Sequence, residues 1–545
     1  MNIEQIRAAA EADSPCLCDS SCIKILVASS SSDSNADRLL DIFQDAVRKV
    51  GLQARVVRTG SFGCYDLEPI VVADVPDFSA ILHRNVTPDS VPLLIEDCLK
   101  KNIHKQTGAF CWAGSKKADG IPCMEELPLF RFQNRIALRN CGWIDPENIN
   151  HYVVHGQGYT RLSGILRLER RALLKSLVEP ALRGRNEAAG STEKRWRFCC
   201  ESEESDKYLI CNAVDMDPQA LTARLLLDSD PHSVLEGMLM GAYAAGASRG
   251  FILVKENTNS AWRIKNALDQ MRTYNLIGAN VLDSDFSLEI EVREVPAAAV
   301  SGYETELFRC IEENQPRPHV QPIHPLADEI MQRPAVITCP EILSYLSAGG
   351  TDDGKGSKIV TLAGGVIHPY TVEVPFETTI DTLVAELGGG AADGKTIKAA
   401  KLGGPAGVFI THDLFDRSVE QALEAEESDP SFCLGTIEVF DSDTCMVNAA
   451  KNVMSYVQAR SCGKCLFCRE GSLQMLTILE DIADDRASFG DLELLTDLGK
   501  NMKEACLCAF GRAVPDPVLS SIRLFRSEYE ERIKSSPHKA STLNR

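Results

Sequence analysis

The alternation of apolar and polar positions near the start of the chain predicts a small α/β domain over residues 21–105. Residues 23–27 (IKILV) form a short apolar run of the kind that builds a strand. Apolar residues then recur at helical spacing, at Leu39, Phe43, Val47 and Val50. Gly51 ends this pattern, and a second short strand (ARVV) follows. Residues 1–20 are assigned to an N-terminal tail.

The middle of the chain predicts a larger α/β domain over residues 120–345. Helical patterns alternate there with strands such as KYLIC and GFILV, as in a fold of three layers. A compact module rich in strands and turns follows, with the glycine-containing turns AGG, LGGG and LGGPAG. We assign this module to residues 346–430.

Beyond Asp443 the pattern becomes helical. Apolar residues mark one face of the last predicted helix, at Val518, Ile522, Phe525, Tyr529 and Ile533. Because a helix with one apolar face needs partners to cover it, we expect residues 431–545 to form a helical bundle. The predicted fold class is therefore an α/β multidomain chain with a helical C-terminal domain.

Composition and charge narrow the classes of function. The chain has 545 residues, of which 44% are hydrophobic and 25% charged, which is typical of a folded protein with several domains. A net charge of −20 argues against a nucleic-acid partner, since phosphates are bound by clustered Lys and Arg. No apolar run approaches the ~20 residues that cross a bilayer, and the first residues lack the apolar stretch of a signal peptide. We expect a cytoplasmic protein without membrane insertion.

Twenty cysteines in a reducing compartment are buried thiols or metal ligands, because disulfides do not persist there. The stretch SCGKCLFCREG places Cys462, Cys465 and Cys468 three residues apart, and CLCAFGRAVPDP supplies Cys506 and Cys508. Three thiolates on one turn with a remote fourth are typical of a [4Fe–4S] cluster. Structural zinc is the alternative, but zinc more often uses two separate C-x2-C pairs, so the run of three favours iron.

These cysteine motifs, with DPHSVLEGM, KYLICNA, KLGGPAG and LRNCGWIDPENI, resemble the NADH-oxidising flavoprotein subunit of complex I and of bifurcating [FeFe] hydrogenases. The resemblance implies a Rossmann-like domain for FMN and NADH, a ubiquitin-like module of the SLBB type and a helical bundle with the cluster. It also implies a thioredoxin-like domain at residues 21–105. The cluster ligands carried over are Cys462, Cys465, Cys468 and Cys508. Cys506 stands where the family has a small residue that is not a ligand.

The flavin-binding loop departs from the family pattern. The glycine-rich loop of the family reads LRGRNEAAGSTEKRW here, which keeps Arg183, Arg185 and Lys194. The glycines of the family are replaced by Asn186, Glu187, Ala189 and Glu193. The aromatic residue that stacks on the nucleotide is replaced by Gly190. Glycine lets the backbone approach a phosphate closely. A carboxylate about 4 Å from a phosphate costs roughly 4 kcal/mol at an effective dielectric constant of 20, which weakens binding about a thousandfold.

The other nucleotide-binding segments depart as well. NAVDMDPQ keeps Asn212 and replaces an acidic residue of the family with Val214, and VPAAAVSGYET keeps Glu304. Where the family has two asparagines near the flavin ring, this chain has Thr338 and Cys339. Arg183, Arg185, Lys194, Asn212 and Glu304 would therefore be the cofactor-binding residues only if a nucleotide or flavin binds.

The ligand positions of the first domain are also changed. A [2Fe–2S] cluster in a thioredoxin-like domain needs four thiolates, but Ser61 and Tyr65 occupy ligand positions here and Cys64 is displaced by one. We predict a docking or structural module without this cluster. Cys16, Cys18 and Cys22 lie in front of the strand and are interpreted as free thiols.

The sequence therefore predicts an electron-transfer subunit of a multi-subunit oxidoreductase that holds one [4Fe–4S] cluster and has no catalytic residues of its own. FMN and NAD(H) are not expected as cofactors, and the expected partners are iron–sulfur and flavoprotein subunits, in an electron-bifurcating complex by analogy. One alternative is an active NAD(P)H:acceptor oxidoreductase subunit with a remodelled FMN site. A second alternative is a scaffold subunit whose cluster serves folding alone.

Overall fold

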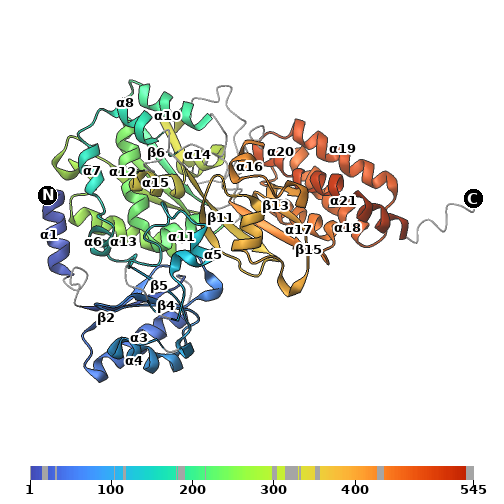
Figure 1. Cartoon of the computed structure of the whole chain (residues 1–545). Coiled ribbons are helices and arrows are strands. Elements are labelled where there is room, and N and C mark those ends of the chain that lie inside the picture. Colours follow the sequence, from blue (N-terminus) through green and yellow to red (C-terminus); the bar gives the residue numbers. More distant parts are fainter. Residues whose placement is uncertain are drawn as a thin grey trace, which may run out of the picture.

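The computed structural model describes residues 2–14, 22–30, 34–103, 105–114, 118, 120–178, 181, 191–214, 217–296, 304–313, 329–330, 333–349, 356–425 and 435–535. Over these ranges the chain forms three five-stranded sheets and a C-terminal group of helices (Figure 1). This confirms a mixed α/β multidomain chain with a helical C-terminal region. Among the helices within these ranges, none has the length and apolar run needed to cross a lipid bilayer.

The first sheet has the strand order β2-β1-β3-β4-β5. Its strands are β1 (Ile23–Ala28), β2 (Ala54–Thr59), β3 (Ile70–Asp74), β4 (Ala80–His83) and β5 (Ala109–Ala113). Strands β1 and β2 are parallel, and the remaining pairs are antiparallel. Side chains of a strand alternate between the two faces. Ile25 and Val27 therefore pack with helices α3 (Ser34–Val50) and α4 (Val91–Lys100), whereas Leu26 and Ala28 face the β-rich module.

Within the predicted N-terminal tail, Ile3–Asp13 forms helix α1. Asn2 caps it, since the Asn2 side chain accepts from the Gln5 N–H and the Gln5 side chain accepts from the Asn2 N–H. Ile6 and Ala10 are buried against the large α/β domain. The start of the chain is thus anchored to that domain.

The second sheet has the strand order β8-β7-β6-β10-β9. Its strands are β6 (Tyr208–Ala213), β7 (Arg249–Lys255), β8 (Glu289–Val295), β9 (Glu329–Ile330) and β10 (Arg333–Thr338). All adjacent pairs are parallel except β10 and β9. Every residue of β6 is buried, as expected for a central strand covered on both faces.

Helices cover both faces of the second sheet and give the three layers that the sequence predicts. Helices α12 (Pro231–Ala245), α13 (Asn259–Thr273) and α15 (Pro340–Ala348) pack on one face, and α14 (Glu304–Glu313) packs on the other. Gly237 of α12 lies against Leu343 of α15, where an added Cβ would stand 1.8 Å from the Leu343 carbonyl oxygen. The other helices of this region are α5 (Pro128–Arg131), α6 (Ile149–His155), α7 (Thr160–Ile165), α8 (Arg170–Leu173), α10 (Ser191–Glu201) and α11 (Thr222–Ser229).

The third sheet forms the β-rich module and has the strand order β12-β11-β15-β13-β14. Its elements are β11 (Ser357–Gly364), β12 (Thr371–Pro375), β13 (Ile397–Leu402), β14 (Val408–Ile410), helix α16 (Val419–Ala425) and β15 (Thr436–Asp441). The central strands β11 and β15 are parallel, while β12 and β14 are antiparallel to their neighbours. Helix α21 (Asp516–Ser535) closes over β14, where the Phe409 N–H donates to Ser520 Oγ at 3.0 Å.

The C-terminal helices are α17 (Met446–Ala459), α18 (Leu466–Ala483), α19 (Phe489–Ala505), α20 (Ala509–Ala513) and α21. They lie at the opposite end of the molecule from α1 (Figure 1). Four residues of the predicted apolar face of α21 are buried in the bundle, at Val518, Ile522, Tyr529 and Ile533. Phe525 instead packs toward the β-rich module, and the backbone leaves helical geometry at that residue.

Candidate metal centre

The predicted cluster cysteines come from three places that the helical fold brings together. Cys462 precedes α18, Cys465 caps its N-terminus and Cys468 lies in its first turn. Cys508 is the N-cap of α20, directly after the end of α19. Helices α18 and α19 approach closely at Gly471, where an added Cβ would lie 2.6 Å from Met502 Sδ. This contact brings the start of α18 beside the end of α19.

The loop before α18 is shaped by a glycine and held by an arginine. Gly463 has φ +71°, a conformation that side chains with a Cβ rarely adopt. Arg469 Nη1 donates to the Gly463 carbonyl oxygen at 3.0 Å. The loop is therefore fixed around the three cysteines. Cys462 is exposed, whereas Cys465, Cys468 and Cys508 are buried.

Hydrogen bonds distinguish the thiol of Cys468 from its neighbours. The Cys506 side chain hydrogen-bonds to it, and Ser461 Oγ lies 3.5 Å from Cys468 Sγ. The hydrogen bond from Cys506 is the main cause that lowers the pKa of Cys468 to about 7. The same bond, followed by burial, raises the pKa of Cys506. Cys468 therefore forms the thiolate, the form that binds metals, more readily than an ordinary cysteine.

The charges of the other predicted ligands affect the pKa of Cys508. Burial raises the pKa of Cys508 to about 11, the Gly511 backbone N–H opposes this rise, and the charges of Cys468, Cys462 and Cys465 add to it. Four thiolates this close repel one another unless cationic metal neutralises them. The site therefore combines the soft sulfur donors and the burial that an iron–sulfur cluster needs.

A single zinc ion and a cubane iron–sulfur cluster need different arrangements of the four cysteines. Zinc holds four sulfurs around one point at about 2.3 Å, whereas a cubane cluster binds each cysteine at a separate iron corner. Within the described parts of the chain, no three His, Cys, Asp or Glu side chains are gathered as a single ion requires. The preference for a cluster over a zinc ion therefore rests on the run of three cysteines in the sequence.

Exposed apolar residues adjoin these cysteines in the sequence. We define the rim as Leu466, Phe467 and Leu507, which are 58%, 50% and 42% exposed. Each rim residue is adjacent in sequence to a predicted ligand or to Cys506. Apolar side chains exposed together beside a functional site are typical of a surface that a partner covers.

A second candidate location is the large α/β domain at the carboxyl ends of β6 and β10. The sheet grows from β6 toward β7 on one side and toward β10 on the other, so these strands flank a topological switch point. Ligands of open α/β sheets bind at such points. Thr338 Oγ1 is buried there without a hydrogen-bond partner among the described residues. The sequence places Thr338 near the flavin ring by resemblance, but it could not show that the hydroxyl is buried and unpaired.

Comparisons with known proteins bear on both locations. The family described as "NADH-ubiquinone oxidoreductase-F iron-sulfur binding region" matches residues 448–532, and the "Nuo51 FMN-binding domain" matches residues 178–333. The NADP-reducing hydrogenase subunit HndC of Solidesulfovibrio fructosivorans is 34% identical over 414 residues, which cover 74% of this chain and 84% of that protein. An NADH-quinone oxidoreductase subunit of Streptomyces coelicolor is 29% identical over 69% of this chain and 86% of that protein.

The chain belongs to the family of the complex I flavoprotein subunit.

A solved structure has the same fold. The crystal structure of an NAD+-reducing [NiFe]-hydrogenase in the H2-reduced state matches with a TM-score of 0.60 and 22% sequence identity. The match covers 94% of this chain and 85% of the hydrogenase chain. The order of sheets and helices along this chain is therefore an arrangement that a solved structure also has.

The structure locates only part of the nucleotide-site residues carried over from the complex I flavoproteins. Arg183, Arg185 and the altered loop around Asn186 lie outside the described residues. Glu304 begins α14, but its side chain is also outside them. Lys194 is exposed on α10, and Asn212 is buried near the end of β6. The described residues thus bring none of these five side chains into contact with another.

Asn212 and Val214 stand at positions where the family contacts the nucleotide. In this chain both residues contact other parts of the protein. Asn212 Oδ1 accepts from the Val214 N–H at 3.1 Å. Val214 occupies the position of an acidic residue of the complex I flavoproteins, and it is buried in an apolar cluster with Leu307 of α14 and Val295 of β8. An acidic side chain could not be placed in that cluster without a partner, because burying an unpaired charge is costly.

The first domain uses its altered ligand turn to contact the rest of the protein. Ser61 and Cys64 are buried, the Ser61 N–H donates to Ser229 Oγ at 3.0 Å, and Thr371 N–H donates to the Gly63 carbonyl oxygen at 2.8 Å. Tyr65 also hydrogen-bonds to Thr371. The turn where a [2Fe–2S] domain would hold ligands is therefore a contact between three parts of the fold. Cys16 and Cys18 lie outside the described residues, and Cys22 precedes β1.

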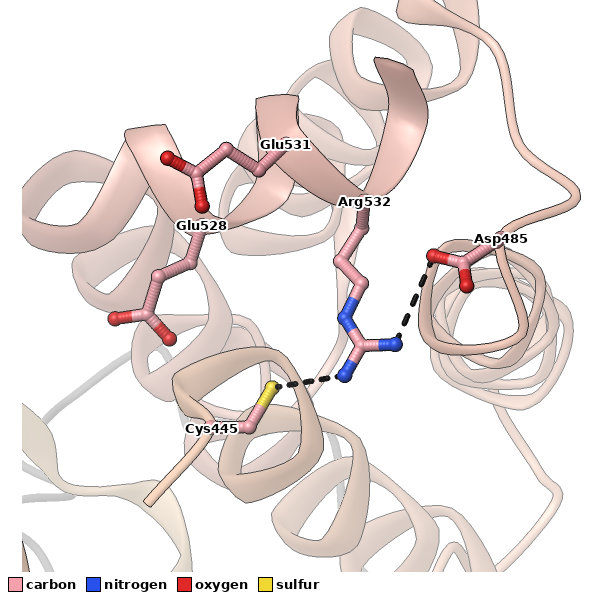
Figure 2. A pocket seen from close by; sticks show the side chains of 5 residues that line it. All are labelled: Cys445, Asp485, Glu528, Glu531 and Arg532. Atoms are coloured by element: carbon pink, nitrogen blue, oxygen red, sulfur yellow. Dashed lines mark hydrogen bonds and ion pairs between the residues drawn. The ribbon is translucent and has the colours of Figure 1, made fainter. Parts of the chain in front are cut away.

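A hollow of about 370 Å³ opens elsewhere on the helical domain. Figure 2 shows its lining, which consists of Cys445, Asp485, Glu528, Glu531 and Arg532. Arg532 reaches both Asp485, at 3.6 Å, and Cys445 Sγ, at 4.0 Å. Glu528 accepts from the Met446 N–H at 2.9 Å. These contacts join the ends of α17, α18 and α21, which is a structural role.

Proposed function

We propose that this protein is an electron-transfer subunit of a multi-subunit oxidoreductase and holds one [4Fe–4S] cluster in its helical domain. The observation that carries the proposal is the convergence of Cys462, Cys465, Cys468 and Cys508 at the meeting point of α18, α19 and α20. The match of residues 448–532 to an iron–sulfur binding region supports it. When bound, the cluster supplies one-electron transfer.

The domain assignment is part of the proposal. The mixed sheet β1–β5, which extends the predicted domain of residues 21–105 as far as β5, supports a thioredoxin-like domain. The mainly parallel sheet of residues 120–345 supports a Rossmann-like domain of the flavoprotein type. The order β12-β11-β15-β13-β14 supports a ubiquitin-like module of the SLBB type, and its sheet extends beyond the predicted residues 346–430 because it includes β15. Of residues 431–545, the helices α17 to α21 would then be the cluster domain, and residues 1–20 an N-terminal segment.

The proposal also holds that FMN and NADH chemistry has been lost. Its support is the set of altered contact positions, including Val214 in an apolar cluster and Glu187 and Glu193 in the loop that approaches phosphate in the family. Flavin separates a hydride into single electrons. A subunit without flavin must receive and deliver electrons that are already separated. Its partners would be iron–sulfur and flavoprotein subunits, in an electron-bifurcating assembly by analogy.

Two observations favour a second candidate, an NAD(P)H:acceptor oxidoreductase subunit with a remodelled FMN site. Residues 178–333 match an FMN-binding domain, and the orphaned Thr338 hydroxyl lies at the switch point of that sheet. A bound flavin could accept or donate a hydrogen bond at this hydroxyl. Arg183, Arg185, Lys194, Asn212 and Glu304 would be the cofactor-binding residues of that candidate.

Cofactor analysis of the anaerobically purified full chain tests the proposal. Iron, zinc and acid-labile sulfide are measured per chain, and released flavin is measured by fluorescence. About four irons and four sulfides with no flavin are expected for a cubane cluster. Stoichiometric FMN would establish the second candidate, and stoichiometric zinc without sulfide would reject the cluster. A cluster that dithionite cannot reduce would indicate a scaffold role.

A further inference from the structure

The segment of residues 160–200 has the opposite charge to the chain as a whole. It holds ten Lys and Arg and four Glu, whereas the whole chain carries a net charge of −20. Helices α8 and α10 belong to this segment, and both contact α12 and the turn at residues 174–178. They lie next to each other at the outside of the large α/β domain (Figure 1). The fold therefore gathers cations on one face of an acidic protein.

Several of these cations have no carboxylate partner. Arg167, Arg171, Lys175 and Lys194 are exposed, and none of them forms an ion pair within the described ranges of the chain. Lys207, by contrast, is buried and donates to two carbonyl oxygens near the end of α10, each at 2.7 Å. Lys207 has an internal role, whereas the four exposed cations are available to a partner.

An acidic stretch adjoins these cations at the end of α10. Residues 201–206 read ESEESD. Glu204 forms an ion pair with Arg333. Glu201, Glu203 and Asp206 are exposed and pair with no cation of the part of the chain that the structure describes. Unpaired charges of both signs therefore follow one another along the same surface.

The outer face of α10 arranges such charges symmetrically. Residues three, four and seven positions apart share one face of a helix, so Lys194, Phe198 and Glu201 form a row. Phe198 is 42% exposed between the two charges, while Trp196 and Cys199 are buried on the opposite side. The row is about 10.5 Å long. A second α10 in antiparallel orientation would place its Glu201 at Lys194 and its Lys194 at Glu201, with the two Phe198 rings at the centre.

We propose that this face of α10 is the centre of a two-fold contact between two copies of the chain. In a two-fold interface the same surface of both copies is in contact, so that surface must carry both members of each complementary pair. The outer face of α10 does so. A different acidic partner could pair with the cations, but its carboxylates would then oppose the adjoining Glu201, Glu203 and Asp206. The inference does not depend on the proposed cluster.

Sedimentation velocity of the purified full chain tests the contact at about 0.1 M and about 1 M salt, where the Debye lengths are about 10 Å and 3 Å. We expect a dimer at the lower salt concentration that dissociates at the higher one. Lys194→Glu creates two pairs of like charges across the two-fold axis and should weaken dimerisation at least about a hundredfold. Glu201→Lys should have the same effect. An equimolar mixture of the two variants should dimerise again, because opposite charges then face each other at both ends of α10.

The matched control is Lys49→Glu, since Lys49 is an exposed residue of α3 in the first domain. This variant should keep the dimer. A monomeric wild-type chain at about 0.1 M salt would overturn the inference and leave the cations of α8 and α10 to a different protein. Equal weakening by Lys194→Glu and Lys49→Glu would overturn it as well, because the copies would then meet over another face. Iron and sulfide should be equal in all these variants, and their absence from the wild-type chain would reject the proposed function alone.

Discussion

Glu341 and Lys358 form an ion pair between the large α/β domain and the β-rich module, with both side chains only 4% exposed. Glu341 lies in the first turn of α15, and Lys358 lies on β11. The second carboxylate oxygen of Glu341 accepts from the Ile359 N–H at 2.8 Å. The two domains are thus joined by a charge pair that has almost no contact with water.

Lys358→Met should destabilise the protein by about 3–5 kcal/mol, because it leaves the Glu341 carboxylate buried without a counter-charge. Urea unfolding of the full chain measures this change. The double variant Lys358→Met/Glu341→Gln should recover part of the loss, since Gln keeps an acceptor for the Ile359 N–H and carries no charge.

The matched control is Lys265→Met, which breaks the exposed pair of Lys265 and Glu294. Exposed pairs contribute little, so its unfolding midpoint should stay close to wild type. Equal losses in Lys358→Met and Lys265→Met would contradict the role given to the buried pair.

Gly63→Ala should separate the first domain from the β-rich module. Gly63 has φ +89°, and an added Cβ would stand 2.3 Å from the Thr371 carbonyl oxygen, which cannot move without distorting β12. Gly51→Ala is the control, since Gly51 also has a positive φ, +63°, but nothing lies within 4 Å of the added Cβ. Gly51→Ala should cost roughly 1 kcal/mol of unfolding free energy from backbone strain alone.

The Gly63 variant should lose at least about 2 kcal/mol more than the Gly51 variant. It should also become more sensitive to limited proteolysis between the first domain and the rest. Similar behaviour of the two variants would show that the turn does not hold the domains together.

Ionisation of Asp145 should lower the stability of the folded protein as the pH rises from 3.8 to about 6. Burial raises the pKa of Asp145 from 3.8 to about 6. A carboxyl with a raised pKa binds its proton more tightly in the folded state, so its stabilising contribution is full below pH 3.8 and is lost as the pH passes 6. The hydrogen bond from the Glu147 N–H opposes this rise in the pKa, as do Arg263 and Arg55, whereas the charge of Glu147 adds to it.

Asp145→Asn removes this titration and keeps the side-chain oxygen that accepts from the Glu147 N–H at 2.9 Å. The variant should gain stability relative to wild type at pH 7 and approach it at pH 4. Thermal unfolding at both values measures the difference. A constant offset across this range would show that Asp145 does not titrate near pH 6.

The strands and helices that the sequence predicted are those whose apolar residues recur at a regular local spacing. The apolar run at residues 23–27 corresponds to β1, and the helical spacing that ends at Val50 corresponds to α3. Both patterns are local, because β1 is apolar on its two covered faces and α3 on one face. Phe525 shares the spacing of its neighbours but turns away from them, because a departure from helical geometry at that residue depends on packing against the β-rich module.

The remaining features could not be predicted because they join distant segments. The contact between Gly63 and Thr371 depends on how two sheets meet, and neither residue belongs to a motif. Cys506 could be recognised as an additional thiol, but its hydrogen bond to Cys468 depends on the approach of α18 and α19 at Gly471. The spacing of cysteines predicts that a site exists, whereas packing decides which thiols touch.

Cys465→Ser should remove or convert the cluster, because a serine oxygen is a poorer ligand for iron than a thiolate. Iron per chain and the EPR signal of the reduced protein measure this loss. Glu304→Ala should leave electron transfer through the assembled complex unchanged if hydride chemistry is absent. Equal loss of activity in both variants would contradict the proposed relay and favour an active NAD(P)H site.

The apolar rim should control how electrons leave or enter the cluster. Leu466 and Phe467 lie between Cys465 and Cys468, and at least half of each side chain is exposed, so a partner that approaches this face must cover them. Leu466→Lys/Phe467→Lys places two strongly hydrated charges there. We expect about a tenfold lower rate of electron transfer within the native complex, which corresponds to roughly 1.4 kcal/mol of docking free energy.

The control for this surface is Leu494→Lys on α19, because Leu494 is 49% exposed but does not adjoin a cluster cysteine in the sequence. Iron content and midpoint potential should be unchanged in all variants, so that a slower rate reports docking rather than cluster damage. Stopped-flow reoxidation of the cluster by the co-purified partner subunits measures the rate. If the rim variant and Leu494→Lys slow transfer equally, the partner does not dock over the rim, and electrons reach the cluster from another face.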